Sequence, residues 1–149
     1  MSLGSRPLLV LEAEVSAPVS VGDSGGGERR YIPITGGRFE GEINGKVLPG
    51  ADWQTVLADG TIELYAHYAL ETEDGQRIEV TSTGLRAGPP EVLARLGRGE
   101  IVDPSLYYFR TVMRFRTGDP ALARWNTLIA ISVGARRQGL VHLDVYEIL

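Results

Sequence analysis

Asp52, Trp53 and Gln54 form the densest group of side chains that could do chemistry, directly after the Pro49-Gly50 turn. Trp53 offers a flat apolar surface with one donor, and Gln54 offers both a donor and an acceptor. Asp52 would either abstract a proton as a base or bind a hydroxyl group. The alternative is a buried tryptophan with Asp52 capping a turn. The group predicts a pocket wall or the closed end of a barrel.

Tyr68 is the second candidate, because it lies on the apolar face of a predicted strand with Leu64 and Ala66. If this face points into the protein, the tyrosine hydroxyl needs a hydrogen-bond partner. That partner would be Asn126, Gln54 or a ligand. A structural hydrogen bond and a functional role therefore both stay open for Tyr68.

Arg110 shares one face of a later strand with Tyr108 and Arg114, by the period-two rule. Its guanidinium group could clamp a carboxylate, because the fork of donors matches two oxygens at once. The alternatives are an ion pair with Glu63 or Glu71 on a neighbouring strand, or a solvated outer face.

Arg38 and Asn126 are weaker candidates. Arg38 follows the Gly36-Gly37 corner and could reach a cavity from there, although a surface position is the commoner outcome. Asn126 is predicted to begin a strand, where an asparagine usually satisfies backbone groups rather than taking part in catalysis.

Several kinds of chemistry are disfavoured. The chain has no cysteine, so disulfides and thiolate nucleophiles are excluded. The two histidines, His67 and His142, lie on separate predicted strands and are not spaced as a pair of metal ligands. No glycine run matches a phosphate-binding fingerprint between a strand and a helix. We therefore expect no metal and no cofactor.

The composition is that of one ordinary globular domain. We expect residues 1–149 to form it, with 1–5 as a disordered tail or a cloning remnant. The net charge of −4 argues against nucleic-acid binding. No apolar run approaches the roughly 20 residues that span a bilayer, and we see no secretory signal. We therefore expect no membrane partner and a cytoplasmic location.

Alternation of apolar and polar residues dominates the chain and predicts short strands. We expect these strands within 8–15, 30–35, 38–43, 46–48, 55–57, 61–72, 76–83, 106–117, 126–133 and 140–148. Helical turns are expected only at 91–96 and 121–124, and turns at 84–103 and 134–139. This pattern predicts an all-β fold, a single antiparallel barrel of eight to ten strands with the up-and-down meander of lipocalins and streptavidin. Such a barrel is either filled by side chains or holds one small ligand.

The sequence also resembles a known family through an ordered series of segments. They are GGRFEG, NGKVLPGADWQ, LYAHYALETEDG, YYFRTVMRFRTGDP and WN, and they span about Arg30 to Tyr146. In this order they resemble the bacterial family called domain of unknown function 3237. The resemblance implies a small β-barrel and a set of recurring positions, but no settled reaction.

Three functional hypotheses follow. The first is a barrel that binds a small, moderately apolar and in some cases acidic metabolite through Arg38, Trp53, Gln54, Tyr68, Tyr108, Arg110 and Asn126. The second is a cofactor-independent isomerase, cyclase or lyase, in which Asp52 abstracts a proton and Tyr68 or Arg110 stabilises the oxyanion. The third is a module that self-associates into a homo-oligomer through an apolar strand face.

Overall fold

The alternation in the sequence corresponds to strands with one buried and one exposed face. In β6 (Ile62–Thr72), Leu64 and Tyr68 are buried, whereas Glu63 and Tyr65 are exposed. The computed structural model describes all residues 1–149. Its other strands are β1 (Ser5–Val15), β2 (Val19–Asp23), β3 (Glu28–Gly41), β4 (Gly45–Val47), β5 (Gly50–Val56), β7 (Arg77–Ala87), β8 (Tyr108–Arg116), β9 (Ala130–Arg137) and β10 (Leu140–Ile148).

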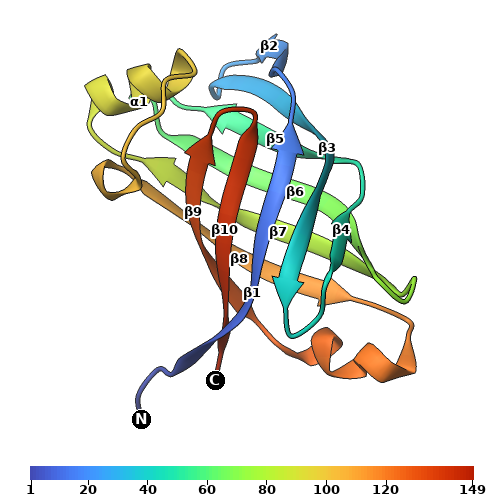
Figure 1. Cartoon of the computed structure of the whole chain (residues 1–149). Coiled ribbons are helices and arrows are strands. Elements are labelled where there is room, and N and C mark those ends of the chain that lie inside the picture. The colour runs from blue at the N-terminus through green and yellow to red at the C-terminus, as the bar shows by residue number, and fades with distance from the viewer.

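These strands close into an antiparallel barrel (Figure 1). Strands β6 to β10 pair in sequence order, β10 pairs with β1, and β1 pairs with β3. Strand β5 then joins β3 to β6 and completes a ring of eight strands, with β2 as an additional strand on β3 and β4 as an additional strand between β3 and β6. The predicted all-β barrel is confirmed. Closure leaves the ring without a free edge, which removes a site of aggregation.

One end of the barrel is filled by apolar side chains. The 3₁₀ segment η2 (Pro120–Thr127) begins after Asp119, whose carboxylate accepts a hydrogen bond from the Ala121 N–H at 2.9 Å. It inserts Trp125, which is 1% exposed, against Phe115 with ring centroids 5.0 Å apart in an edge-to-face arrangement. We call this region the plug end.

The opposite end lies beneath α1 (Pro90–Gly97), and Figure 1 shows α1 and η2 far apart at the two ends of the barrel. Val92, Leu93 and Leu96 are buried, so the predicted helix and its apolar face are confirmed. The chain then passes through the short 3₁₀ segment η1 (Pro104–Leu106) into β8. No helix has the length and apolar character needed to cross a bilayer.

Among the strands that run further than the sequence predicted, β7 and β9 do so because glycines on them mark close contacts rather than turns. Strand β7 continues past Gly84 to Ala87, and a Cβ at Gly84 would overlap the carbonyl oxygen of Arg110. Strand β9 continues past Gly134, where a Cβ would lie 2.8 Å from the Phe109 ring. The predicted breaks at 84 and at 134 are therefore wrong.

Candidate functional site

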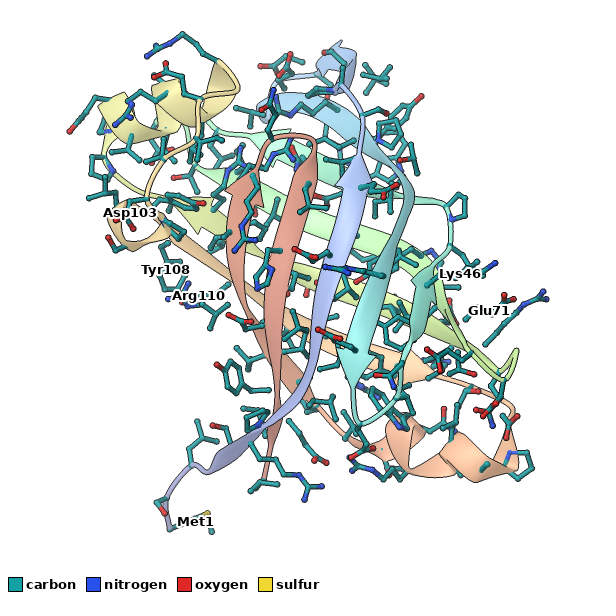
Figure 2. All side chains as sticks on the ribbon, in the orientation of Figure 1. Met1, Lys46, Glu71, Asp103, Tyr108 and Arg110 are labelled. Carbon is teal, nitrogen blue, oxygen red and sulfur yellow. The ribbon has the colours of Figure 1, made fainter.

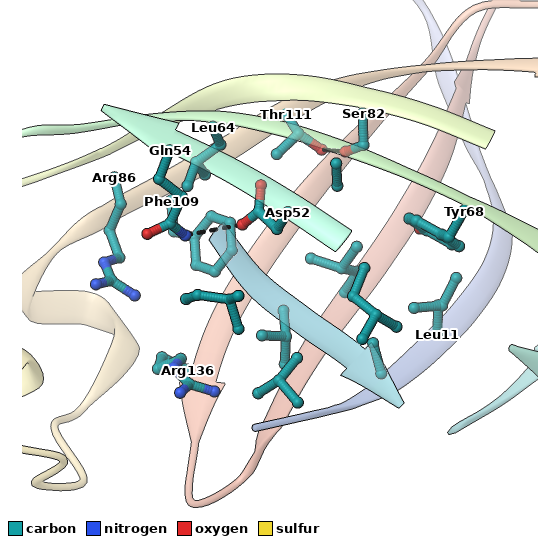
Figure 3. A pocket seen from close by; sticks show the side chains of 17 residues that line it. Leu11, Asp52, Gln54, Leu64, Tyr68, Ser82, Arg86, Phe109, Thr111 and Arg136 are labelled. Atoms are coloured by element: carbon teal, nitrogen blue, oxygen red, sulfur yellow. Dashed lines mark hydrogen bonds between the residues drawn. The ribbon is translucent and has the colours of Figure 1, made fainter. Parts of the chain in front are cut away.

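The barrel encloses a partly open cavity near the α1 end, drawn in Figure 3. The volume of the cavity is about 60 Å³. Most of its wall is apolar, from Leu11, Ile34 and other residues of β1, β3, β6 and β10. The polar side chains on the wall are Asp52, Gln54, Tyr68, Ser82, Arg86, Thr111 and Arg136.

Asp52 and Gln54 face the cavity because they lie two residues apart on β5. The Gln54 Nε2 donates a hydrogen bond to Asp52 Oδ2 at 2.8 Å, and Gln54 Oε1 accepts one from Arg30 Nε at 2.9 Å. Gln54 thus bridges a guanidinium group and a carboxylate. The other carboxylate oxygen, Asp52 Oδ1, is buried and has no hydrogen-bond partner.

The environment of Asp52 disfavours its ionised form. Burial raises the pKa of the Asp52 carboxyl from 3.8 to about 6, although the hydrogen bond from Gln54 and the nearby backbone N–H of Tyr65 lower it. The charges of Arg86 and Arg30 also favour the carboxylate, but they do not outweigh desolvation. A carboxyl group that titrates this close to neutrality can take up and release a proton under physiological conditions.

Tyr68 on β6 also lines the cavity, and it is 7% exposed. Its hydroxyl has no hydrogen-bond partner. Burial raises the pKa of Tyr68, and the charge of Asp52 raises it further, so the phenol stays neutral and is a donor. Tyr68 and Asp52 therefore present a hydrogen-bond donor and a carboxylate to the same cavity.

Two arginines occupy the opposite end of the cavity from Tyr68 (Figure 3). Arg86 on β7 is 6% exposed, and its Nε is buried without a partner. Arg136 on β9 is half-buried and donates weakly to the Leu140 carbonyl at 3.4 Å. Burial, reinforced by the charges of Arg136 and Arg30, lowers the pKa of Arg86 to about 10, so it remains charged at neutral pH.

A ladder of hydroxyl groups crosses the wall between these ends. The Ser82 hydroxyl donates to Thr111 Oγ1 at 2.8 Å, and Thr111 Oγ1 is also hydrogen-bonded to Ser132 Oγ. All three residues are buried. Because these hydroxyls satisfy one another, the ladder fixes the spacing of β7, β8 and β9 around the cavity.

Several residues expected at the pocket lie elsewhere. Trp53 points away from the cavity, since it is the neighbour of two inward residues, and packs on Tyr31 with ring centroids 4.8 Å apart. Tyr108 and Arg110 lie on the outer face of β8, with the guanidinium carbon 5.0 Å from the tyrosine ring centroid. Figure 2 shows both side chains outside the barrel.

The remaining two have structural partners. Arg38 is exposed and forms an ion pair with Glu12 at 3.0 Å. Asn126 lies in η2 rather than at the start of a strand, so that prediction is wrong. It accepts from the Thr117 N–H at 2.8 Å and donates to the Thr117 carbonyl at 3.0 Å. Of the expected binding residues, the structure brings only Gln54 and Tyr68 to the cavity, together with the catalytic candidate Asp52.

Sequence reasoning missed Arg86 and Arg136. Both lie in segments where the sequence predicts turns, at 84–103 and 134–139. In the structure, each arginine continues the period-two alternation of its strand. Arg86 follows Ser82 and Gly84 at intervals of two, and Arg136 follows Ser132 and Gly134 in the same way. Carrying the alternation through the glycines would have placed both arginines on the inner face.

No group of three His, Cys, Asp or Glu side chains is placed to hold a metal ion. The outer faces of β7 to β9 expose Leu85, Tyr108, Val112 and Val133, and Ile129 is exposed just before β9. That apolar face is where the hypothesis of self-association would apply, and it stays a prediction.

The barrel and its sequence match known proteins over nearly the whole chain. The family model described as "Protein of unknown function (DUF3237)" matches residues 4–148. The UPF0311 protein blr7842 of Bradyrhizobium diazoefficiens is 42% identical over 149 residues, 99% of this chain and 98% of that protein.

Solved structures agree. The conserved protein of unknown function RPA1785 from Rhodopseudomonas palustris has a TM-score of 0.97 at 42% identity, covering 100% of this chain and 99% of that one. The β-barrel-like protein ABAYE2633 from Acinetobacter baumannii AYE has a TM-score of 0.87 at 35% identity, covering 100% and 98%. This chain therefore belongs to the DUF3237 family of proteins of unknown function.

Proposed function

We propose that the protein binds a small, largely apolar molecule inside the barrel, with polar contacts to Asp52, Tyr68 and Arg86. One observation carries the proposal. The structure has three buried side-chain polar atoms without a hydrogen-bond partner, Asp52 Oδ1, Tyr68 Oη and Arg86 Nε, and all three side chains line this cavity. A buried polar group without a partner is costly, so three around one space indicate groups awaiting a ligand.

The size of the cavity limits the ligand. Pockets for drug-sized molecules usually enclose about 300–1,000 Å³, whereas the space here is about 60 Å³. The ligand is therefore small or extends out of the barrel through the arginine end. Its enclosed part is apolar, to match Leu11, Ile34 and Leu143, and it carries a donor for Asp52.

A cavity-filling variant tests this proposal. Ala66 lines the cavity on β6, and Ala69 on the same strand is on the outer face. Small apolar alcohols and acids are screened by thermal shift on the wild type, Ala66→Leu and Ala69→Leu. We expect compounds that raise the melting temperature of the wild type and of Ala69→Leu but not of Ala66→Leu. No such compound, or equal stabilisation of all three proteins, would count against an interior site.

A second function is favoured by the pairing of Asp52 and Tyr68. A carboxyl group with a pKa of about 6 and a neutral phenol on the same cavity are the parts of a proton-transfer enzyme that needs no cofactor. Asp52 would take a proton from carbon beside a carbonyl group, and the Tyr68 hydroxyl would donate a hydrogen bond to the oxyanion. Arg110 lies on the outer face of β8, so it does not stabilise an oxyanion in the cavity.

Deuterium exchange separates the binder from the enzyme. A carbonyl compound found by the thermal-shift screen is incubated in D₂O with the wild type and with Asp52→Asn, and deuterium uptake beside the carbonyl is followed by NMR. The enzyme hypothesis predicts uptake with the wild type only, while Asp52→Asn still binds. Equal uptake with both proteins would contradict the enzyme hypothesis and leave binding as the function.

A further inference from the structure

The arginine end of the cavity has more positive charge than its surroundings neutralise. Arg30, Arg86 and Arg136 lie close enough that the charge of Arg30 lowers the pKa of the other two. None of the three forms an ion pair with a carboxylate anywhere in the structure. Asp52 is the one acid among the groups that influence Arg86, and its carboxylate is bound by Gln54.

Arg86 is also the residue that the interior cavity shares with a groove at the surface. It lines the interior cavity and also a groove of about 300 Å³ beneath α1. Arg30, Ile62 and Leu93 line the same groove. The one acid in the groove is Asp59, and its carboxylate accepts a hydrogen bond from the Thr61 N–H at 2.9 Å rather than contacting an arginine.

The two observations define an amphiphilic site. Arg86 lies on the groove and on the cavity, and the cavity beyond it has an apolar wall that includes Ile34, Leu64 and Leu143. A buried guanidinium group without a counter-ion is strongly destabilising, and a carboxylate supplies both the opposite charge and two acceptor oxygens. The buried, unpartnered Arg86 Nε is the donor aimed at such a group.

We infer that the ligand is a small carboxylic acid whose carboxylate is bound by Arg86 and Arg136, while its largely apolar tail, with a polar group for Asp52 and Tyr68, occupies the barrel. This inference rests on the proposed interior site and names the chemical class that the site takes. It replaces Arg110, which the sequence suggested as the carboxylate clamp, with two arginines on the inner face.

Matched pairs of simple probes test the inference. Straight-chain carboxylates from acetate to octanoate and the corresponding primary alcohols are titrated into the full-length protein by calorimetry at pH 7.5. We expect octanoate to bind at least tenfold more tightly than 1-octanol. Burial of about 0.8 kcal/mol per methylene predicts up to about fourfold tighter binding for each methylene that enters the barrel.

Variants assign the effect to the inner arginines. Arg86→Met is expected to remove the preference for carboxylate over alcohol, and Arg136→Met to reduce it. Arg110→Met is the control on the outer face and is expected to keep the preference. The comparison of carboxylate with alcohol in the wild type does not depend on whether any variant folds.

The outcomes separate this inference from the proposed function. If alcohols bind as tightly as carboxylates, with affinity rising with length, the interior site stands and the carboxylate inference is overturned. If carboxylates bind with the same affinity at every length, the arginine site stands and interior binding fails. If no probe binds, both are overturned.

Discussion

At the plug end the barrel interior is apolar and filled, whereas at the α1 end it is hollow, and a mostly apolar wall carries buried polar side chains. Trp125, Phe115, Leu70, Ile78 and Val80 are all at most 1% exposed, and none of the buried polar side-chain atoms that lack a partner belongs to them. At the α1 end, every buried polar side-chain atom that lacks a partner lines one cavity. Under the proposed function, the plug end stabilises the fold and the α1 end gives up stability for binding.

The largest expected effect lies at the plug end. Trp125→Ala removes an indole that packs edge-to-face on Phe115 and is 1% exposed. We expect a loss of about 3–5 kcal/mol in the free energy of unfolding, because a large buried aromatic leaves a cavity that the barrel cannot close. Guanidinium unfolding measures it, and a loss below about 1 kcal/mol would mean that the plug end is not the stable part of the core.

The next effect has the opposite sign and lies at the hollow end. The Asp52 carboxyl has a pKa of about 6 in the folded chain against an ordinary value of 3.8. Between these values the folded chain binds more protons than the unfolded chain, so stability falls as the pH rises through this window. Each pKa unit corresponds to about 1.4 kcal/mol, which gives a cost of about 3 kcal/mol above pH 6.

Asp52→Asn is therefore expected to raise the free energy of unfolding by up to about 3 kcal/mol at pH 7.5 and to change it little at pH 3.8 or below. Urea unfolding at a series of pH values measures the difference. Asp74→Asn, at an exposed turn, is the control and is expected to have no such pH dependence. A gain that does not grow with pH would show that burial of the Asp52 charge is not the cause.

The smallest effect compares two tyrosines that are equally buried. The Tyr107 hydroxyl accepts a hydrogen bond from the Arg136 N–H at 2.8 Å, whereas the Tyr68 hydroxyl has no partner. We expect Tyr107→Phe to cost about 1 kcal/mol and Tyr68→Phe to cost nothing or to stabilise the protein slightly. Thermal unfolding of both variants measures this, and an equal loss would indicate that the Tyr68 hydroxyl has a partner within the protein.

The sequence predicted the closed barrel because the alternation of apolar and polar residues along each strand can be read from neighbouring positions. It did not determine which face of each strand points inward, and that decided the site. On β5, the inward face carries Asp52 and Gln54, while Trp53 packs outside on Tyr31. The same ambiguity made Arg110 appear to be a candidate clamp, although its face is the outer one.

The arginines were missed for a different physical reason. Gly84 and Gly134 looked like the ends of strands, because glycine weakens a strand and is common in turns. In the structure both glycines make room for a neighbouring strand or ring, and the strands continue to Arg86 and Arg136. A close contact between distant segments requires a glycine just as a turn often does, so the sequence alone does not distinguish the two.

The most direct test is methyl NMR of the wild-type protein during a titration with octanoate. We expect methyl signals of Leu11, Leu64 and Leu143, which line the cavity, to shift or broaden as octanoate is added. Signals of Leu70, Ile78 and Val80 at the plug end are expected to stay unchanged. Unchanged cavity signals beside shifts confined to the outer face or the plug end would contradict the claim that the hollow end is a ligand site.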